Sequence, residues 1–443
     1  MGKNVLMLVL DSLRKDRTSV YNDDIEFTPE LERIAEESEV YMNAVAQAPW
    51  TLPSHASMFT GEYPHQHGAG QSKTFFRYDG ENLVEKFKKE GYQTGAVTSN
   101  VWMTPHKGMT DEFDFTENFL GVSGRKPSVW LSRLGTKLFD IMPESLKKPV
   151  ERYIDRVFDA AGIDDSCKSR ETIEETKDFI SRNQDRDFFL YTNIMEPHEP
   201  YNPPQKYLRA HGIEDLENIP ERQKDLFTQD VDFDKLERVY EASVDYTDDL
   251  VKEVLDHLED EDVLDDTVVV VLSDHGQALG ENGIFGHQFT VDPAVTDIFM
   301  TVRSPEEEKT DDHDEMFELK EIYNLLPQLA GFQEGRVSST EVAKGRYQFP
   351  TCFIGYVPKT EWDRYYRKYQ YLSTKDGYAV RCVDHEGNEE YRGLDGLEMD
   401  PVKAKRDLRE MDDENTENTE EASKKDLAED DEIKKRLEDL GYK

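Results

Sequence analysis

The sequence predicts an α/β fold in which a mixed, mostly parallel central sheet lies between helices, with a small antiparallel sheet near the C-terminal end. Three largely apolar runs, at 5–10, 187–193 and 267–272, stop abruptly at polar residues. Such runs are typical of strands buried on both faces of a parallel sheet. Amphipathic segments with helical spacing separate them, as in βαβ units. After residue 346 short strands alternate with turn sequences, which indicates the second sheet.

The remaining elements follow from local patterns. A helix is expected over 28–37, because Thr28 can cap it and Pro29 suits a first helical position, where no backbone N–H is needed. The other expected elements are helices over 82–91 and 233–258 and strands over 93–98, 298–302, 370–374, 378–383 and 389–392.

These elements suggest one large domain with appendages. The expected units are a catalytic domain at 1–345 that carries a mostly helical insertion at 119–182, an antiparallel subdomain at 346–405, an acidic linker at 406–430 and a C-terminal amphipathic helix at 431–443. The linker is expected because its sequence is acidic and poor in apolar residues.

The charge of the chain restricts its partners and its source. The net charge is −41, from 54 basic and 95 acidic residues spread along most of the chain. Such repulsion destabilises a compact domain unless salt screens it, so we expect a halophilic, archaeal source. Nucleic acid is not an expected partner. No run of about 18 apolar residues predicts a membrane span, and no signal peptide is apparent, so a cytoplasmic location is expected.

The insertion reverses the local charge. Residues 125–156 hold eight Lys or Arg against four Asp or Glu, with aromatic and aliphatic residues between them. The segment is either a packed helical insert whose cations offset neighbouring acids, or a lid or peripheral membrane-surface helix that attracts anions.

Chemistry-bearing residues cluster where predicted strands end and where one helix begins. Asp11 follows the first apolar run, and Asp274 and His275 follow the last one. Open α/β sheets bind ligands at this edge. His198 follows the run at 187–193 in a proline-stiffened loop. Thr51 lies at or just before the start of a helix that is expected to have Pro53 at its first position, where it either caps the helix or meets an anion.

Three segments together resemble the motifs of the sulfatase-like branch of the alkaline phosphatase superfamily. The nucleophile motif is matched by Thr51-Leu-Pro-Ser-His55, then Thr60-Gly61, then Pro64-His-Gln-His-Gly68. The opening metal motif is matched by Asp11-Ser-Leu-Arg14. The late metal motif is matched by Ser273-Asp-His-Gly276, followed by a loop that ends in His287. The resemblance implies an alkaline-phosphatase-like core for the fold.

The chain also departs from the sulfatase pattern. Thr51 stands where sulfatases carry the Cys or Ser that becomes formylglycine, and Thr cannot yield that aldehyde. His55 replaces an Arg, Asn100 takes the place of a substrate-binding Lys and His, and Gln277 stands where Glu is frequent. Other branches of the superfamily, including phosphodiesterases, use a plain Thr.

The resemblance implies a metal-dependent ester hydrolase or group transferase acting on a small anionic phosphate or sulfate ester. Asp11, Thr51, Asp274 and His275 would hold one divalent metal ion, which could be Ca²⁺, Mg²⁺, Mn²⁺ or Zn²⁺. Thr51 would be the nucleophile and form a covalent intermediate. The expected substrate-binding residues are His55, Asn100, His198 and His287, with His198 or His287 protonating the leaving group.

The same residues leave two alternatives open. The first is an arylsulfatase-like sulfuric ester hydrolase that works without formylglycine. The second is a catalytically silent member of the fold that binds an anion.

Overall fold

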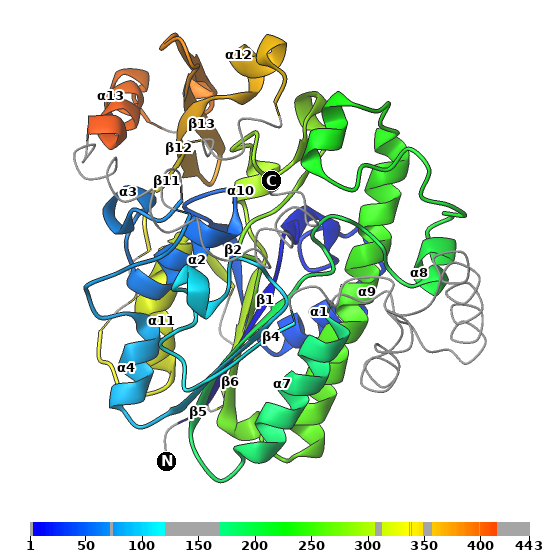
Figure 1. Ribbon diagram of the computed structural model, residues 1–443. Helices are drawn as coiled ribbons and strands as arrows, with labels where there is room; N and C mark the ends of the chain where they lie inside the picture. Colours follow the sequence, from blue (N-terminus) through cyan, green and yellow to red (C-terminus); the bar gives the residue numbers. More distant parts are fainter. Residues whose placement is uncertain are drawn as a thin grey trace.

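An eight-stranded sheet forms the centre of the molecule in the computed structural model (Figure 1). The structure describes residues 3–70, 74–119, 169–305, 312–335, 337, 339–348, 357–397 and 399–413. The strands are β1 (Asn4–Leu10), β2 (Glu39–Val45), β3 (Gln93–Thr98), β4 (Phe115–Asn118), β5 (Phe188–Ile194), β6 (Thr267–Leu272), β9 (Met300–Arg303) and β10 (His313–Glu318).

The sheet is mixed and mostly parallel, as predicted. Its strand order is β10-β2-β9-β6-β1-β5-β3-β4. The run from β6 to β4 is parallel throughout, and β9 is antiparallel to both of its neighbours. The carboxyl ends of four adjacent parallel strands, β6, β1, β5 and β3, therefore lie at one edge of the sheet.

Two hydrophobic cores cover the two faces of this sheet. Along β1, Val5, Met7 and Val9 contribute to one core, and the alternate leucines contribute to the other. This alternation follows from the two-residue repeat of a strand, and it explains why the whole of β1 is apolar. Helices α2 (Thr51–Thr60), α4 (Leu83–Lys89) and α11 (Ile322–Leu329) lie on one side of the sheet, and α1 (Pro29–Glu36), α7 (Arg170–Arg182) and α9 (Phe233–Asp260) lie on the other (Figure 1).

The predicted strands and helices of the core are confirmed, with ends that differ by one or two residues. The strands at 93–98 and 267–272 have the predicted bounds. Thr28 precedes α1, with Pro29 at its first position, but its side chain makes no capping hydrogen bond. Short elements complete the core: α3 (Pro64–His67), α8 (Gln205–Ala210), α10 (Pro293–Thr296), and the two-stranded sheet of β7 (Ala278–Leu279) and β8 (Phe285–Gly286).

A four-stranded antiparallel sheet lies near the C-terminal end, as predicted. Its strands are β11 (Ala343–Gln348), β12 (Lys368–Thr374), β13 (Gly377–Val383) and β14 (Glu389–Arg392), with α12 (Trp362–Tyr365) before β12. The expected domain boundary at 345 lies inside β11. This sheet contacts the segments around the site: the hydroxyl of Tyr347 donates to the carbonyl of Gln288 at 2.6 Å, and that of Tyr369 donates to Phe289 at 2.9 Å.

Part of the expected acidic linker is a helix instead. Residues Pro401–Asp413 form α13, so the linker predicted at 406–430 is wrong for its first eight residues. Ala404, Leu408 and Met411 are buried against Leu372 and Ala379 of the antiparallel sheet. Burial of this apolar stripe outweighs the acidic composition that suggested a linker.

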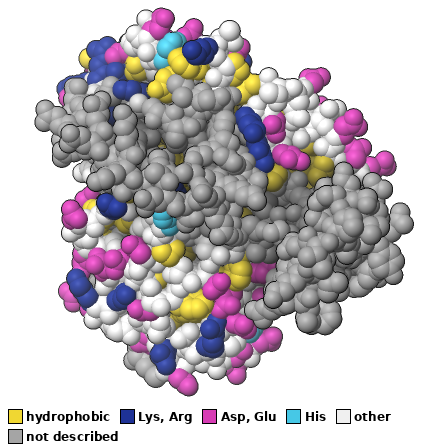
Figure 2. Space-filling view, viewed as in Figure 1, with side chains coloured by type: hydrophobic (Ala, Val, Ile, Leu, Met, Phe, Trp, Pro, Cys, Tyr) yellow, Lys and Arg dark blue, Asp and Glu magenta, His cyan; other side chains and the backbone are white. Residues whose placement is uncertain are grey.

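Several expectations lie outside the described residues. These are the basic segment at 125–156, most of the insertion at 119–182, and the helix expected at 431–443. Among the described helices, none is long and apolar enough to cross a membrane. Asp and Glu side chains are scattered over the visible part of the face in Figure 2, with Lys and Arg among them.

Candidate active site

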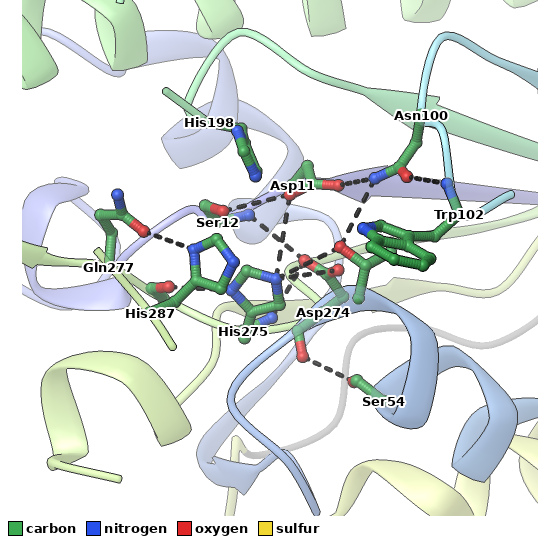
Figure 3. A network of polar contacts seen from close by, with 12 residues as sticks. Asp11, Ser12, Ser54, Asn100, Trp102, His198, Asp274, His275, Gln277 and His287 are labelled. Carbon is green, nitrogen blue, oxygen red and sulfur yellow. Dashed lines mark hydrogen bonds and ion pairs between the residues drawn. The ribbon is translucent and has the colours of Figure 1, made fainter. Parts of the chain in front are cut away.

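The candidate site lies at the carboxyl ends of four neighbouring parallel strands. Asp11 follows β1, Asn100 follows β3 and Asp274 follows β6, and all three side chains are buried. His198 lies on the loop after β5, which pairs with both β1 and β3. Residues that are far apart in the sequence therefore meet because their strands are adjacent (Figure 3).

Thr51 reaches this site from the other side, at the start of α2. The helix begins at Thr51 itself, so Pro53 is its third residue and not its first. Gly61 ends the helix in the left-handed conformation, as its position predicts. The Oγ1 atom of Thr51 lies 3.5 Å from Nε2 of His275 and 3.4 Å from Nδ2 of Asn100. The hydroxyl thus lies beside the backbone N–H groups of a helix N-terminus.

Two buried carboxylates and one imidazole form a compact group beside this hydroxyl. Nε2 of His275 lies 3.4 Å from Oδ2 of Asp274 and 3.9 Å from Oδ1 of Asp11. The three residues offer ligand atoms that all lie within 4.8 Å of one another. Nδ1 of His275 donates to the carbonyl of Gly276 at 2.9 Å, which leaves Nε2 unprotonated in the neutral ring.

The charges of this group fit a divalent cation. The pKa of Asp274 is raised well above its ordinary value by burial and by the negative charge of Asp11. Burial also tends to raise the pKa of Asp11, but the surrounding histidines and Asn100 outweigh it, so that pKa is lowered. Oδ2 of Asp274 is buried and accepts no hydrogen bond from any described residue. Two carboxylates, one open oxygen and one imidazole lone pair are a suitable donor set for such an ion.

Two amides orient Asp11. Asn100 donates to Oδ2 of Asp11 at 2.7 Å, and its own Oδ1 accepts from the backbone of Trp102. Asn193 donates to the same Oδ2 at 3.3 Å. Asn193 was not among the predicted site residues, although a polar residue at the end of the buried β5 was a usable signal. Both amides leave Oδ1 of Asp11 facing the imidazole of His275.

The backbone after β1 is held in an unusual conformation. Ser12 has a φ of 62°, which is rare for a residue other than glycine. Its N–H donates to Oδ1 of Asp274 at 3.2 Å, and its carbonyl accepts from the hydroxyl of Tyr240 at 2.9 Å. These contacts tie the end of β1 to the end of β6 and to α9.

The loop after β6 is fixed by a close backbone approach. A Cβ atom at Gly276 would lie 2.1 Å from the carbonyl oxygen of Ala294, so no larger residue fits without a backbone shift. The N–H of Gly276 donates to Val295 at 2.8 Å. On the other side, Ser54 of α2 donates to the carbonyl of Asp274 at 2.7 Å. These bonds place the metal-motif loop between α10 and α2.

His55 lies beside the site, but both of its ring nitrogens already have partners. Nδ1 donates to the carbonyl of Thr51 at 2.9 Å, and Nε2 accepts from the hydroxyl of Tyr191 at 2.8 Å. Burial lowers the pKa of His55 to about 4, so the ring is neutral near pH 7. The ring therefore holds the first turn of α2 and presents no unused nitrogen to an ester oxygen.

His198 and His287 line the side of the site away from α2. Their ring centroids lie 5.2 Å apart, and the ring of His287 lies 4.5 Å from that of His275 (Figure 3). Nδ1 of His198 donates to the carbonyl of Glu199, and Nδ1 of His287 contacts Oε1 of Gln277 at 2.9 Å. The structure thus brings together all of the predicted site residues, with His55 as a supporting residue.

The fold and this buried carboxylate–imidazole–hydroxyl group define an α/β protein with a candidate metal-binding site at the carboxyl edge of its sheet. A family model described as Sulfatase matches residues 3–318, and the chain belongs to the sulfatase family. It is 25% identical over 363 residues to a sulfatase of Formosa agariphila, which covers 74% of this chain and 69% of that protein. It is 24% identical to human iduronate 2-sulfatase, a match covering 66% of this chain but only 58% of the relative.

Solved structures support the same fold. A phosphonate monoester hydrolase from Silicibacter pomeroyi superposes with a TM-score of 0.65 at 17% identity, covering 95% of this chain and 96% of that one. The protein BT4656, solved with its substrate D-glucosamine-2-N,6-O-disulfate, superposes with a TM-score of 0.64 at 14% identity, covering 94% and 98% of the two chains.

Proposed function

We propose that this protein is a metal-dependent hydrolase or group transferase of phosphate or sulfate esters that uses Thr51 as its nucleophile. The observation that carries the proposal is the position of the Thr51 hydroxyl. It lies 3.5 Å from Nε2 of His275, within the same buried cluster as Asp11 and Asp274. A buried threonine that only capped its helix would need none of these neighbours.

In this proposal Asp11, Asp274 and His275, together with the Thr51 hydroxyl, hold one divalent cation, and the candidate ions are Ca²⁺, Mg²⁺, Mn²⁺ and Zn²⁺. Such an ion lowers the pKa of a bound hydroxyl and neutralises charge on an ester oxygen. Asn100 and Asn193 keep Asp11 in place. His55 keeps the first turn of α2 in place through the carbonyl of Thr51. These supporting contacts pre-organise the site before an ester arrives.

In the proposed reaction, side chains of this protein both attack the ester and transfer the proton of the Thr51 hydroxyl. Oγ1 of Thr51 forms a bond to phosphorus or sulfur while the bond to the leaving oxygen breaks. The hydroxyl proton passes to Nε2 of His198 or His287, which then protonates that oxygen. In the second half, water or an acceptor alcohol attacks the Thr51 ester, and its proton returns to Thr51 by the same nitrogen. The ester group ends on water or on the acceptor.

Phosphate or phosphonate esters are the first candidate substrates. Thr51 cannot form the aldehyde used by formylglycine sulfatases, and a threonine ester is released by displacement at the central atom. The fold shared with phosphonate monoester hydrolases is consistent with this chemistry. Sulfate ester hydrolysis without an aldehyde is the second candidate, because the chain belongs to a family whose named relatives include arylsulfatase and choline-sulfatase.

The test is an assay of the purified full chain in high salt, with each cation in turn, against aryl phosphate, phosphodiester, phosphonate and sulfate esters. Turnover of at least one ester is expected to need a divalent ion. Thr51→Val is expected to reduce kcat by at least about 1000-fold, because the nucleophile is lost. Mass spectrometry of a quenched slow reaction is expected to find the transferred group on the peptide that contains Thr51.

Thr60→Val is the matched control, because Thr60 lies at the other end of α2 and its hydroxyl bonds only to the Ala56 carbonyl and the Glu62 N–H among the described contacts. It is expected to keep nearly full activity. Equal rates for Thr51→Val and wild type would refute the nucleophile. Metal binding without turnover of any ester would support a silent anion-binding protein instead.

A further inference from the structure

Glu199 lies between the two histidines that border the site. Its Oε2 atom is 3.6 Å from Nδ1 of His198 and 3.9 Å from Nδ1 of His287, and all three residues are buried. The spacing alone resembles a second metal site. However, the facing atoms already have closer partners, because Nδ1 of His198 donates to the Glu199 carbonyl and Nδ1 of His287 contacts Gln277. The group is therefore a hydrogen-bonded support for the two rings.

The orientation of the Gln277 amide follows from its neighbours. One end of this amide lies 2.7 Å from Oε2 of Glu199 and 2.9 Å from the hydroxyl of Tyr201. A carboxylate only accepts hydrogen bonds, so this end must be the NH₂ group. The other end, 2.9 Å from Nδ1 of His287, must then be the carbonyl oxygen. A reversed amide would place two oxygens against each other.

This orientation decides which nitrogen of His287 carries the proton. An amide oxygen can only accept, so Nδ1 of His287 must donate to Gln277. In the neutral ring Nε2 is then a bare acceptor. The NH₂ group of Gln223 donates to Oε1 of Glu199 at 2.9 Å and also approaches Nδ1, at 3.4 Å. Nδ1 cannot accept from Gln223 and donate to Gln277 at once, and an unprotonated Nδ1 would place its lone pair against the oxygen of Gln277 at 2.9 Å. The shorter contact of Nδ1 with Gln277 is therefore the hydrogen bond.

The supporting chain thus runs through three elements of the fold. Gln277 follows β6, Glu199 follows β5, and Gln223 begins the short 3-10 helix at Gln223–Phe227. Both oxygens of Glu199 accept an amide N–H, and the amide of Gln277 donates on one side and accepts on the other. Figure 3 shows the Nδ1 side of His287 facing Gln277 while the ring lies against His275.

We infer that Glu199 and Gln277 form a positioning pair that fixes His287 with its proton on Nδ1 and leaves its Nε2 lone pair open on the site side. His287 can then accept a proton but cannot donate one until it has received one. The catalytic consequence deepens the proposed function and rests on it. The assignment of a proton to Nδ1 of His287 does not rest on the proposed function, because it follows from hydrogen bonds alone.

The first test determines which ring nitrogen of His287 carries the proton. The full chain is labelled with ¹⁵N-histidine and studied by NMR near neutral pH with Mg²⁺ present, and the His287→Asn variant identifies the signals of His287. The Nδ1–H form is expected. His67 is an internal reference for the opposite form, since its Nδ1 accepts from the N–H of Ala69 at 3.1 Å and its Nε2 faces Ser57 at 3.0 Å.

The second test uses the pair itself. Gln277→Met removes the acceptor, so the Nε2–H form of His287 should become populated and kcat should fall about 10- to 100-fold, with a small change in KM. Gln277→Glu alone should also lose activity, because two carboxylates would then face each other. The exchanged variant combines Glu199→Gln with Gln277→Glu. It restores an amide–carboxylate pair in which every donor has an acceptor.

The exchanged variant is therefore expected to recover most of the activity lost in Gln277→Glu and to keep the Nδ1–H form. A purely structural role would not produce this recovery at equal thermal stability. An Nε2–H form of His287 in the wild type would overturn the inference, as would an unchanged tautomer and unchanged kcat in Gln277→Met. If no ester is turned over, the proposed function fails, and the NMR result alone decides the positioning pair.

Discussion

The side-chain amide of Asn100 lies 2.7 Å from Oδ2 of Asp11 and 3.4 Å from Oγ1 of Thr51. One NH₂ group therefore joins a candidate metal ligand to the candidate nucleophile. The amide oxygen is fixed in turn by the backbone N–H of Trp102 at 2.7 Å. Asn100, expected from the sequence to contact substrate, is thus placed to organise the site itself.

Replacing Asn100 should reduce turnover more than it reduces substrate binding. In Asn100→Leu, Asp11 loses its shortest hydrogen bond and Thr51 loses a neighbour, so we expect kcat to fall about 10- to 100-fold. Steady-state kinetics and cation affinity are the measurements. Asn43→Leu is the control, because its amide contacts Asp314 on β10. A change in KM alone for Asn100→Leu would instead favour the substrate-contact role.

Removal of the cation should destabilise the wild-type protein, and Asp274→Asn should abolish that effect. An ion held at 100 times its Kd adds about 2.7 kcal/mol to the free energy of unfolding. Asp274→Asn removes an open ligand oxygen but also removes the repulsion from Asp11, so its chelated form should be at least as stable as the chelated wild type. Thermal unfolding with and without EDTA measures both effects.

Asp265→Asn is the control for this experiment, since that side chain is 96% exposed. It should show the same cation-dependent shift in Tm as the wild type. If Asp274→Asn showed the same cation-dependent shift in Tm as the wild type, the ion would bind elsewhere.

Asp248 should make stability depend on pH. Burial, with the charges of Glu30 and Asp249, raises the pKa of Asp248 to about 7, although the carboxylate accepts the N–H groups of Glu30 and Leu31 at the start of α1. The folded chain therefore binds this proton more tightly than the unfolded chain does. Its contribution to stability is complete below about pH 4 and is lost as pH rises to about 7.

The Asp248→Asn variant keeps an acceptor for α1 but cannot titrate. The free energy of unfolding of this variant, relative to that of the wild type, should increase as pH rises from about 4 to about 7. The increase should be on the order of a few kcal/mol, since one pKa unit corresponds to about 1.4 kcal/mol. Denaturant unfolding at constant ionic strength measures the difference. Parallel pH profiles for the two proteins would contradict the raised pKa.

Salt should stabilise this protein strongly. With a net charge of −41, like-charge repulsion acts on the folded chain and is screened over about 3 Å at 1 M salt, against about 10 Å at 0.1 M. We expect Tm to rise between these concentrations of KCl and to rise much less with sucrose, which does not screen charge. An unchanged Tm in KCl would remove the support for a halophilic source.

Much of the core could be predicted from local sequence. The strand at 267–272 was predicted to the residue, because a strand buried on both faces is largely apolar and ends where polarity returns. The strand at 93–98 was also predicted to the residue, and it ends at the polar pair Ser99-Asn100. The helix α13 was missed although Ala404, Leu408 and Met411 have helical spacing, because acidic composition was given more weight than this stripe. The stripe is stable only against the antiparallel sheet, which lies earlier in the chain.

The sequence by itself determined the α/β class, the strand ends that bear Asp11 and Asp274, and the helix that begins near Thr51, because hydrophobic periodicity and turn chemistry act over a few residues. Only the tertiary structure decided that His55 supports α2, that Asn193 orients Asp11, and that Gln277 sets the proton of His287. Each of these roles also depends on a partner distant in the sequence, which is Tyr191 for His55, Asp11 for Asn193 and Glu199 for Gln277. Such partners are brought together by the order of strands in the sheet, which local patterns do not encode.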